Sequence, residues 1–184
     1  YVPVTEAEKE IIDSYPVQRL HRLRQLAGAE FVYPGANHTR FEHSIGVMYL
    51  AGRLSENPNL SQYLSEDEIQ TIRIAALLHD VGHGPFSHIF EHLLTKFLKK
   101  THEDMTTWII QKSELSDIIS KAGYDPNVIG NLAVGLIEAL FIRKVFKIHA
   151  SYGIIIAGNY VSSIAGYVIV LVSAFLMPSG VDLL

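Results

Sequence analysis

Apolar positions recur at helical spacing through the first hundred residues or so of the chain, with turn-forming residues between the runs. Thr5 followed by Glu8 has the spacing of a capping box, in which each residue hydrogen-bonds to the other's backbone at a helix start. Apolar residues then repeat at every third position before Gly28: Val17, Leu20, Leu23 and Leu26. This pattern predicts two short helices in this region.

A loop and a further helix are predicted next. The stretch from Phe31 to His38 contains proline, glycine and asparagine, which predicts an irregular loop. A helix is then expected from Glu42 to Leu54, with His43 in its first turn.

Two longer helices follow in the sequence. Ser65 and Glu68 form a second capping-box pair ahead of an apolar helix from Ile69 to Asp80, which should end near Gly82. A helix from Phe86 to Lys100 comes after it, and its apolar residues lie at helical spacing along one face. Because no alternating strand pattern precedes about residue 130, the sequence predicts an all-α fold.

The last part of the chain has a different character. Residues 152–177 include no charged residue and are rich in Ile, Val and Ala, a run long enough to cross a bilayer. Serines, glycines and Asn159 interrupt the run, so we do not expect a membrane span. Buried core helices and a misassigned segment are the interpretations that stay open. We therefore divide the chain into a core, 1–135, and a hydrophobic tail, 136–184.

Composition narrows the function classes. A chain of 184 residues with 48% hydrophobic content can bury one substantial core. The net charge of −4 excludes a globally basic nucleic-acid binder, although the cluster His21, Arg22 and Arg24 could contact phosphates, and nothing further supports a nucleic-acid partner. The absence of cysteine fits a reducing, cytoplasmic location and leaves His, Asp and Glu as the strong metal ligands.

Histidines gather in the middle of the sequence. Most of the nine histidines lie between His38 and His102. His79 and Asp80 end an otherwise apolar helix, where a buried imidazole and a buried carboxylate both need partners. A divalent cation such as Mn, Mg, Fe, Ni or Zn satisfies both. Adjacent helical residues point about 100° apart, so a neighbouring element such as the one carrying His43 is expected to supply another ligand.

Two long blocks of sequence carry a specific resemblance. They are YPGANHTRFEHSIGV at 33–47 and LLHDVGHGPFSH at 77–88, and Gln25-Leu26 and Thr101-His102-Glu103 add to them. Together they closely resemble the HD-domain deoxynucleoside triphosphate triphosphohydrolases, members of a superfamily of metal-dependent phosphohydrolases. The resemblance implies that the core, 1–135, is a helical HD domain with the metal in a cleft between the three helices predicted around His43, His79 and His88.

The resemblance also implies the metal ligands. His43, His79 and Asp80 match the family's metal-binding positions. A second aspartate further along completes the family's site, and Asp182 is the nearest match in position, although the segment around it lacks the family's pattern. Asp125 fits worse, because it lies in a Tyr-Asp-Pro-Asn turn.

Catalytic and substrate-binding roles follow from the same resemblance. His88 matches the catalytic histidine and Glu91 its acidic partner, and their i, i+3 spacing puts both on one helix face. Arg40 is expected to stabilise charge on the phosphoryl oxygens. Substrate contacts are implied for Gln25 near the sugar and for three residues near the phosphates: Arg40, His83 and His102. Simpler interpretations stay open, namely that Arg40 pairs with Glu42 or Glu91 and that Gln25 is a solvated helix residue.

The expected activity is metal-dependent hydrolysis of a deoxynucleoside triphosphate to deoxynucleoside and triphosphate. One alternative is an HD phosphohydrolase acting on a nucleoside monophosphate or a signalling nucleotide. Another is a catalytically silent nucleotide-binding or nucleic-acid-binding module that keeps the fold. The resemblance further implies a homo-oligomer that takes a dNTP as its substrate.

Overall fold

The computed structural model describes residues 1–53, 56, 64–86 and 88–135, with residue 88 described by its backbone alone. Every regular element among these residues is helical, and one isolated bridge pairs Arg24 with Thr39. The all-α prediction is confirmed. The elements are α1 (Glu6–Asp13), α2 (Tyr15–Gln18), η1 (Arg19–Arg22), η2 (Ala29–Phe31), α3 (Arg40–Arg53), α5 (Glu66–Leu78), α6 (His88–Leu98), α7 (His102–Lys112), α8 (Glu114–Lys121) and α9 (Pro126–Ala133).

Reciprocal capping bonds start the helices where the sequence predicts them. In α1 the Glu8 N–H donates to Thr5 Oγ1 at 3.2 Å and the Thr5 N–H donates to Glu8 Oε2 at 2.9 Å. Ser65 and Glu68 make the same pair of bonds at the start of α5. A third capping box, which was not predicted, opens α7 with an aspartate in place of the glutamate. These bonds satisfy backbone N–H groups that the first helical turn leaves without partners.

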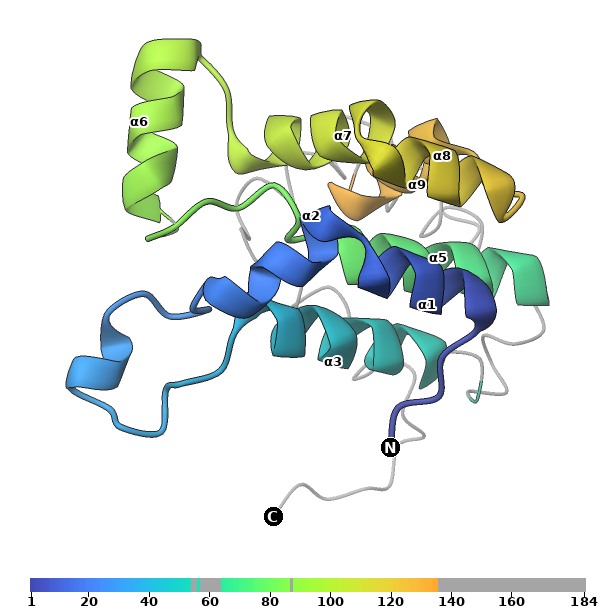
Figure 1. Ribbon diagram of the computed structural model, residues 1–184, viewed down its shortest axis with the longest axis horizontal. Coiled ribbons are helices and arrows are strands. Elements are labelled where there is room, and N and C mark those ends of the chain that lie inside the picture. Colours follow the sequence, from blue (N-terminus) through green and yellow to red (C-terminus); the bar gives the residue numbers. More distant parts are fainter. Residues whose placement is uncertain (54–55, 57–63, 87, 136–184) are drawn as a thin grey trace, which may run out of the picture.

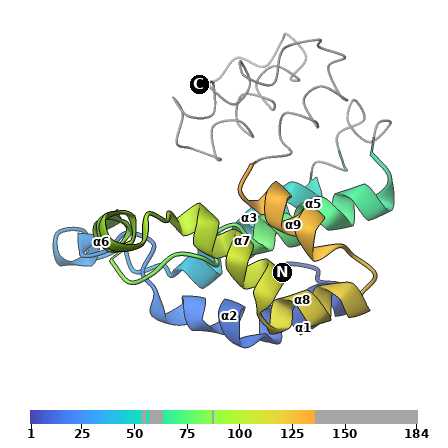
Figure 2. The same cartoon turned by 90° about the horizontal axis from the view of Figure 1, so that it is seen from above.

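The helices pack around α3 and α5, which lie side by side and run in opposite directions (Figure 1). α1 and α2 lie along one side of this pair, and α7, α8 and α9 lie along another (Figures 1 and 2). Apolar side chains from all these layers form one core: Ile11, Val17, Met48, Ile74, Ala75, Leu77, Leu78, Val81, Ile110, Leu115, Ile119 and Ile129. Burial of this apolar surface is the main force that holds the bundle together.

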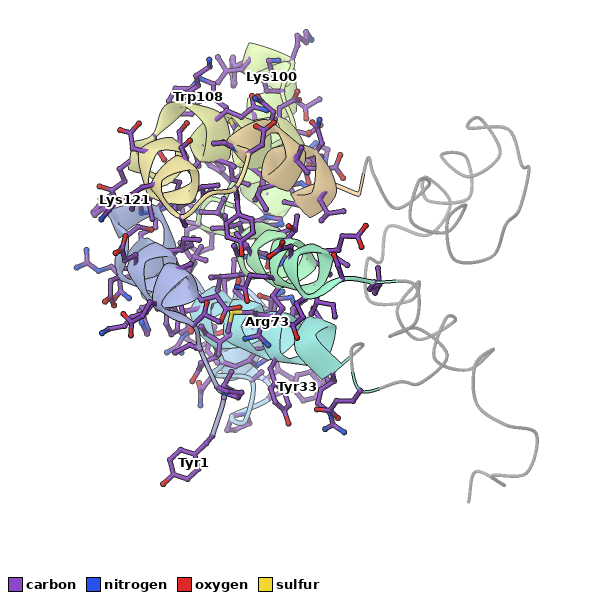
Figure 3. All side chains as sticks on the ribbon, turned by 90° about the vertical axis from the view of Figure 1, so that its right-hand side faces the viewer. Tyr1, Tyr33, Arg73, Lys100, Trp108 and Lys121 are labelled. Carbon is purple, nitrogen blue, oxygen red and sulfur yellow. The ribbon has the colours of Figure 1, made fainter. Side chains whose placement is uncertain are left out.

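An internal ion pair ties α1 to α5. Arg73 lies inside the bundle (Figure 3) and its Nε donates to Glu8 Oε1 at 2.6 Å, with side-chain exposures of 12% and 0% for the two residues. Burial raises the pKa of Glu8, but hydrogen bonds from Arg73 and from the Thr5 backbone, together with the Arg73 charge, outweigh it and hold that pKa below its usual value. Glu8 is therefore buried as a paired carboxylate.

Three helix ends lie on the same side of the bundle. The N-termini of α3 and α7 and the C-terminus of α5 are the left-hand ends of these helices in Figure 1, and α6 stands farther to the left, apart from the rest of the bundle. Figure 2 shows the same separation from above. Predicted site residues at these ends include His43, His79 and His102, so the fold brings distant parts of the sequence together there.

In the part of the chain that the structure describes, no helix is both long and apolar enough to cross a bilayer. The hydrophobic tail, 136–184, and Asp182 within it lie outside the described residues. The division of the chain at residue 135 therefore stays a prediction.

Candidate metal centre

The start of α3 is fixed by short-range bonds around Thr39. Thr39 N–H donates to Glu42 Oε2 at 2.6 Å, and Glu42 N–H donates back to Thr39 Oγ1 at 3.3 Å. The Arg40 N–H also donates to the Leu23 carbonyl at 2.8 Å, which joins this start to the preceding loop. Arg40 and His43, three residues apart in the first turn, therefore share one face of the helix.

The C-terminus of α5 orients His79. Its Nδ1 lies 2.8 Å from the carbonyl oxygen of Ala76, one turn back in the same helix. A carbonyl can only accept, so Nδ1 carries the hydrogen, and in the neutral ring this tautomer leaves the lone pair on Nε2. A metal-binding histidine needs this tautomer, with the second ring nitrogen held by a hydrogen bond.

Three ligand atoms converge between α3 and α5. His43 Nε2 lies 3.2 Å from His79 Nε2, and Asp80 places Oδ1 3.2 Å from His79 Nε2 and Oδ2 3.9 Å from His43 Nε2. One donor atom from each residue lies within 4.8 Å of the other two. Three of the four residues predicted as metal ligands are thus brought together.

The spacing and chemistry of this group fit a divalent cation. Metal–ligand bonds of about 2.0–2.2 Å separate neighbouring ligands by roughly 3 to 3.6 Å, close to the distances between these three side chains. Burial, with the nearby His79 and other charges, lowers the pKa of His43 and favours the neutral imidazole that a metal requires. Burial raises the pKa of Asp80, but electrostatic interactions with His79, Arg40, His83 and His43 hold it below its usual value, so the group is a carboxylate. Two imidazoles and one carboxylate suit the borderline and harder divalent metals.

Arg40 contacts this centre directly. Its Nη1 donates to Asp80 Oδ2 at 2.5 Å, and the two side chains are 4% and 9% exposed. The sequence interpretation that pairs Arg40 with Glu42 or Glu91 did not include this partner. The Arg40 guanidinium instead compensates the negative charge of Asp80. Without such a partner, a carboxylate this deeply buried would be strongly unfavourable.

A second group of polar side chains continues from Asp80. His83 Nε2 lies 3.5 Å from Asp80 Oδ1, and the His83 ring stacks on that of His102 with centroids 4.1 Å apart. His102 Nδ1 lies 2.6 Å from Glu91 Oε1. Burial is the main reason that the pKa of His83 falls to about 3, so this imidazole is neutral near neutral pH. The predicted phosphate-binding histidines therefore lie beside the candidate metal centre.

Of the predicted catalytic pair, the structure describes the side chain of Glu91 but not that of His88. Glu91 hydrogen-bonds to His102, a partner that the sequence did not indicate. The side chain of His88 lies outside the described residues, so its pairing with Glu91 stays a prediction. α7 brings its first turns against the segment that follows Asp80. α6 stands apart from the bundle (Figure 1), with Phe90 close to Gly84 and Glu91 bonded to His102 of α7.

Gln25 and Asp125 have clear local surroundings. Gln25 lies outside any helix and is half-buried, with its backbone N–H donating to the His38 carbonyl at 3.2 Å, so the solvated-helix interpretation is wrong. Asp125 caps α9 by accepting a hydrogen bond from the Asn127 N–H at 2.8 Å. This role agrees with its weaker fit as a metal ligand.

Two side chains that support the site were not predicted. Arg19 Nη2 donates to the carbonyls of Val81 and His83, the latter at 2.9 Å. Thr106 makes hydrogen bonds to the backbone of the same turn and is fully buried. An arginine in a short helix and a threonine on a helix face are ordinary features, so no local pattern could have identified them.

Comparison with known proteins assigns the family. Residues 40–157 match the model of the HD domain, and the chain belongs to the HD domain family. It is 43% identical over 129 residues to the deoxynucleoside triphosphate triphosphohydrolase SAMHD1 of Bos taurus, covering 63% of this chain and 22% of that protein. Over 154 residues it is 35% identical to an uncharacterized protein of Methanocaldococcus jannaschii, covering 82% of this chain and 32% of that protein.

A solved structure is similar as well. The crystal structure of a hypothetical protein from Aquifex aeolicus matches with a TM-score of 0.60 and 39% sequence identity, covering 72% of this chain and 34% of that chain. The resemblance to HD-domain triphosphohydrolases seen in the sequence is confirmed. The chain spans about a fifth to a third of the length of the two curated relatives described above.

Proposed function

We propose that this protein is a metal-dependent phosphohydrolase that converts a deoxynucleoside triphosphate to deoxynucleoside and inorganic triphosphate. The observation that carries the proposal is the group formed by His43, His79 and Asp80, whose donor atoms lie within 4.8 Å of one another. The 43% identity to a protein named as a deoxynucleoside triphosphate triphosphohydrolase supports the choice of substrate.

The predicted ligands would hold the metal through His43 Nε2, His79 Nε2 and the Asp80 carboxylate, with Asp182 as the predicted fourth ligand. A divalent cation bound there supplies water activation and charge neutralisation at phosphorus. The Ala76 carbonyl keeps the His79 tautomer correct, and Arg40 keeps the Asp80 carboxylate in place. These contacts hold the donor atoms ready before substrate arrives, which is the arrangement that electrostatic catalysis requires.

The remaining polar side chains suit the phosphates and the leaving group. His83 is neutral and buried, so its ring can donate a hydrogen bond to a phosphate oxygen without carrying an unpaired charge. Glu91 accepts a hydrogen bond from His102 Nδ1 and so directs the other nitrogen of that ring away from itself. We assign proton donation to the leaving oxygen to His88, as the family resemblance implies, and phosphate contacts to Arg40, His83 and His102. Gln25 is assigned to the sugar.

The test is turnover by the full chain. Purified protein is incubated with each dNTP and Mn²⁺ or Mg²⁺, and deoxynucleoside and inorganic triphosphate are quantified in the same samples. We expect equal amounts of the two products, and we expect His79→Ala to remove both. His92→Ala is the matched control, because His92 is an exposed histidine of α6 that belongs to neither polar group.

Other products would point to other functions. Release of orthophosphate from nucleoside monophosphates, without triphosphate release from dNTPs, would support an HD phosphohydrolase of different substrate class. Folded protein that binds Mn²⁺ and nucleotide but releases no product would support the catalytically silent module. Either result contradicts the proposed reaction.

Self-association and location are further expectations. We expect a homo-oligomer, and sedimentation of the full chain with and without dNTP would detect it. A cytoplasmic location, expected from the cysteine-free sequence, stays a prediction.

A further inference from the structure

A single hydroxyl group bridges the two ends of the turn that contains Asp80. The Gly82 N–H donates to Thr106 Oγ1 at 3.0 Å, and Thr106 Oγ1 donates to the His79 carbonyl at 3.3 Å. One hydroxyl can donate once and accept as well, so both of its capacities are used on this segment. The Thr106 side chain is fully buried, which shields these bonds from water.

The His79 carbonyl is one of the groups that a helix end leaves without an internal partner. α5 ends at Leu78 with His79 as its C-cap, so the carbonyls of its last turn need hydrogen-bond donors from outside the helix. Thr106 supplies one of these contacts from α7. The backbone that carries His79 and Asp80 is therefore held by a side chain from a different helix.

Gly82 shows how closely α7 approaches this turn. A Cβ added at Gly82 would lie 2.3 Å from both the His102 carbonyl oxygen and the Thr106 N atom, and 2.5 Å from Thr106 Oγ1. Separations this short would force the backbone of the turn or of α7 to shift. Glycine is needed here for close approach, and the Thr106 hydroxyl fits the space that remains.

Thr106 also links the two polar groups of the site. It lies four residues after His102 on α7, so the two residues share a face of that helix. His102 stacks on His83, and His83 lies at the other end of the turn from His79. A shift of α7 relative to the turn would therefore move His102 relative to His79, Asp80 and His83.

We propose that Thr106 is a positioning residue for the metal centre, acting through its hydroxyl on the backbone of the turn from His79 to Gly82. The inference rests on the proposed function, because it assigns Thr106 to the site made by His43, His79 and Asp80. It predicts that loss of the hydroxyl lowers affinity for a divalent cation, although Thr106 itself contributes no ligand atom.

The experiment compares two variants that differ by one oxygen atom, Thr106→Ser and Thr106→Ala. Mn²⁺ affinity of the full chain is measured by equilibrium dialysis with elemental analysis, which does not depend on turnover. We expect Thr106→Ser to stay within about twofold of wild type and Thr106→Ala to bind about tenfold more weakly, the range for residues that orient metal ligands. Thr107→Ala is the matched control, because Thr107 is the next residue of α7 and lines an outer groove.

A second readout separates positioning from general stability. Urea unfolding is measured with EDTA and with a fixed excess of Mn²⁺, and the stability added by Mn²⁺ is compared between variants. A tenfold weaker Kd reduces that added stability by about 1.4 kcal/mol, whereas a purely structural defect leaves it unchanged. If Thr106→Ala does not fold, Thr106→Val takes its place, because it removes the hydroxyl while keeping the side-chain volume.

Each remaining result contradicts a specific claim. Wild-type affinity in Thr106→Ala, or an equal loss in Thr106→Ser, would overturn the role of the hydroxyl while leaving the metal centre intact. Absence of Mn²⁺ binding in the wild-type chain would overturn the proposed metal centre and this inference with it.

Discussion

The helices α5 and α6 both carry apolar residues at helical spacing, yet the bundle covers them very differently. In α5, Ile74, Leu77 and Leu78 are fully buried. In α6, Ile89 is 68% exposed and Phe97 is 71% exposed. Apolar periodicity therefore predicts that a helix forms and which face is apolar, but the surface that covers the face must come from elsewhere in the fold.

The two helices also differ in how their site residues are held. His79 and Asp80 follow directly after the buried end of α5, where Leu77 and Leu78 are fully buried. α6 carries Glu91, which reaches the site through its bond to His102, and Phe90, whose ring lies over Gly84. The proposed metal ligands His79 and Asp80 thus follow a helix buried in the core, whereas α6 contacts the rest of the described chain through side chains such as Phe90 and Glu91. Substitutions of core residues in α5 should therefore lower stability, whereas substitution of Glu91 in α6 should lower activity more than stability.

The largest effect is expected for Arg40→Met in metal-free protein. This substitution leaves Asp80 as a buried carboxylate without its guanidinium partner, and such a loss costs about 3–5 kcal/mol in free energy of unfolding. Urea unfolding in EDTA measures it. Mn²⁺ should restore part of the loss, because the cation offers positive charge to the same carboxylate. A change below about 1 kcal/mol would show that solvent reaches the pair, contrary to its exposures of 4% and 9%.

A pair of identical substitutions tests the comparison of the two helices directly. Leu78→Ala in α5 should lower the free energy of unfolding by about 2–5 kcal/mol, because a fully buried leucine leaves a cavity. Leu93→Ala in α6 should change it by less than about 0.5 kcal/mol, since Leu93 is 49% exposed. Thermal and urea unfolding of the full chain provide the measurement. Equal losses at the two positions would mean that the exposed face of α6 is covered in solution.

Glu91→Gln should affect activity more than stability. The neutral amide is a weaker acceptor for His102 Nδ1–H and orients that ring less firmly, so we expect kcat to fall by about tenfold or more. Steady-state kinetics with a dNTP measures the loss, and Glu103→Gln is the control, because Glu103 is exposed on the first turn of α7. Unchanged kcat in Glu91→Gln would remove Glu91 from the proposed machinery.

The smallest effect concerns the acid limit of stability. The folded-state pKa of Glu8 is lower than its ordinary value of 4.5, so the unfolded chain binds more protons just below that pH. Stability from the Glu8–Arg73 pair is therefore complete above about pH 4.5 and is lost as pH falls through the folded pKa, by at most about 1.4 kcal/mol per pH unit. Urea unfolding between pH 5.5 and 3.5 should show a shallower decline in Glu8→Gln than in wild type. An identical decline in both proteins would assign the acid limit to other groups.

The helix starts could be predicted from the sequence because they depend on residues that are close together in it. Thr5 with Glu8 and Ser65 with Glu68 make the capping bonds that their spacing indicates. His43 lies in the first turn of α3, as predicted, although the helix begins two residues earlier, at Arg40. Spacing alone was sufficient for these features, since helix starts depend on residues three apart.

The partners within the site could not be predicted, because they are distant in sequence. Arg40 pairs with Asp80 and Glu91 with His102 only through the packing of separate helices. The metal ligands were named through family resemblance together with the unusual position of His79 and Asp80 at the end of an apolar helix. Thr106 matched no motif, and its contacts depend on how closely α7 approaches Gly82.

The hydrogen bond between His79 and Ala76 has a consequence for how such sites can be studied. The acceptor is a main-chain carbonyl, a group that every amino acid carries, so replacing Ala76 with another helix-forming residue leaves it in place. Neither side-chain mutagenesis nor comparison of related sequences would reveal that position 76 selects the histidine's tautomer. One contact that prepares the proposed metal site thus depends on helix geometry and not on the identity of the residue at position 76.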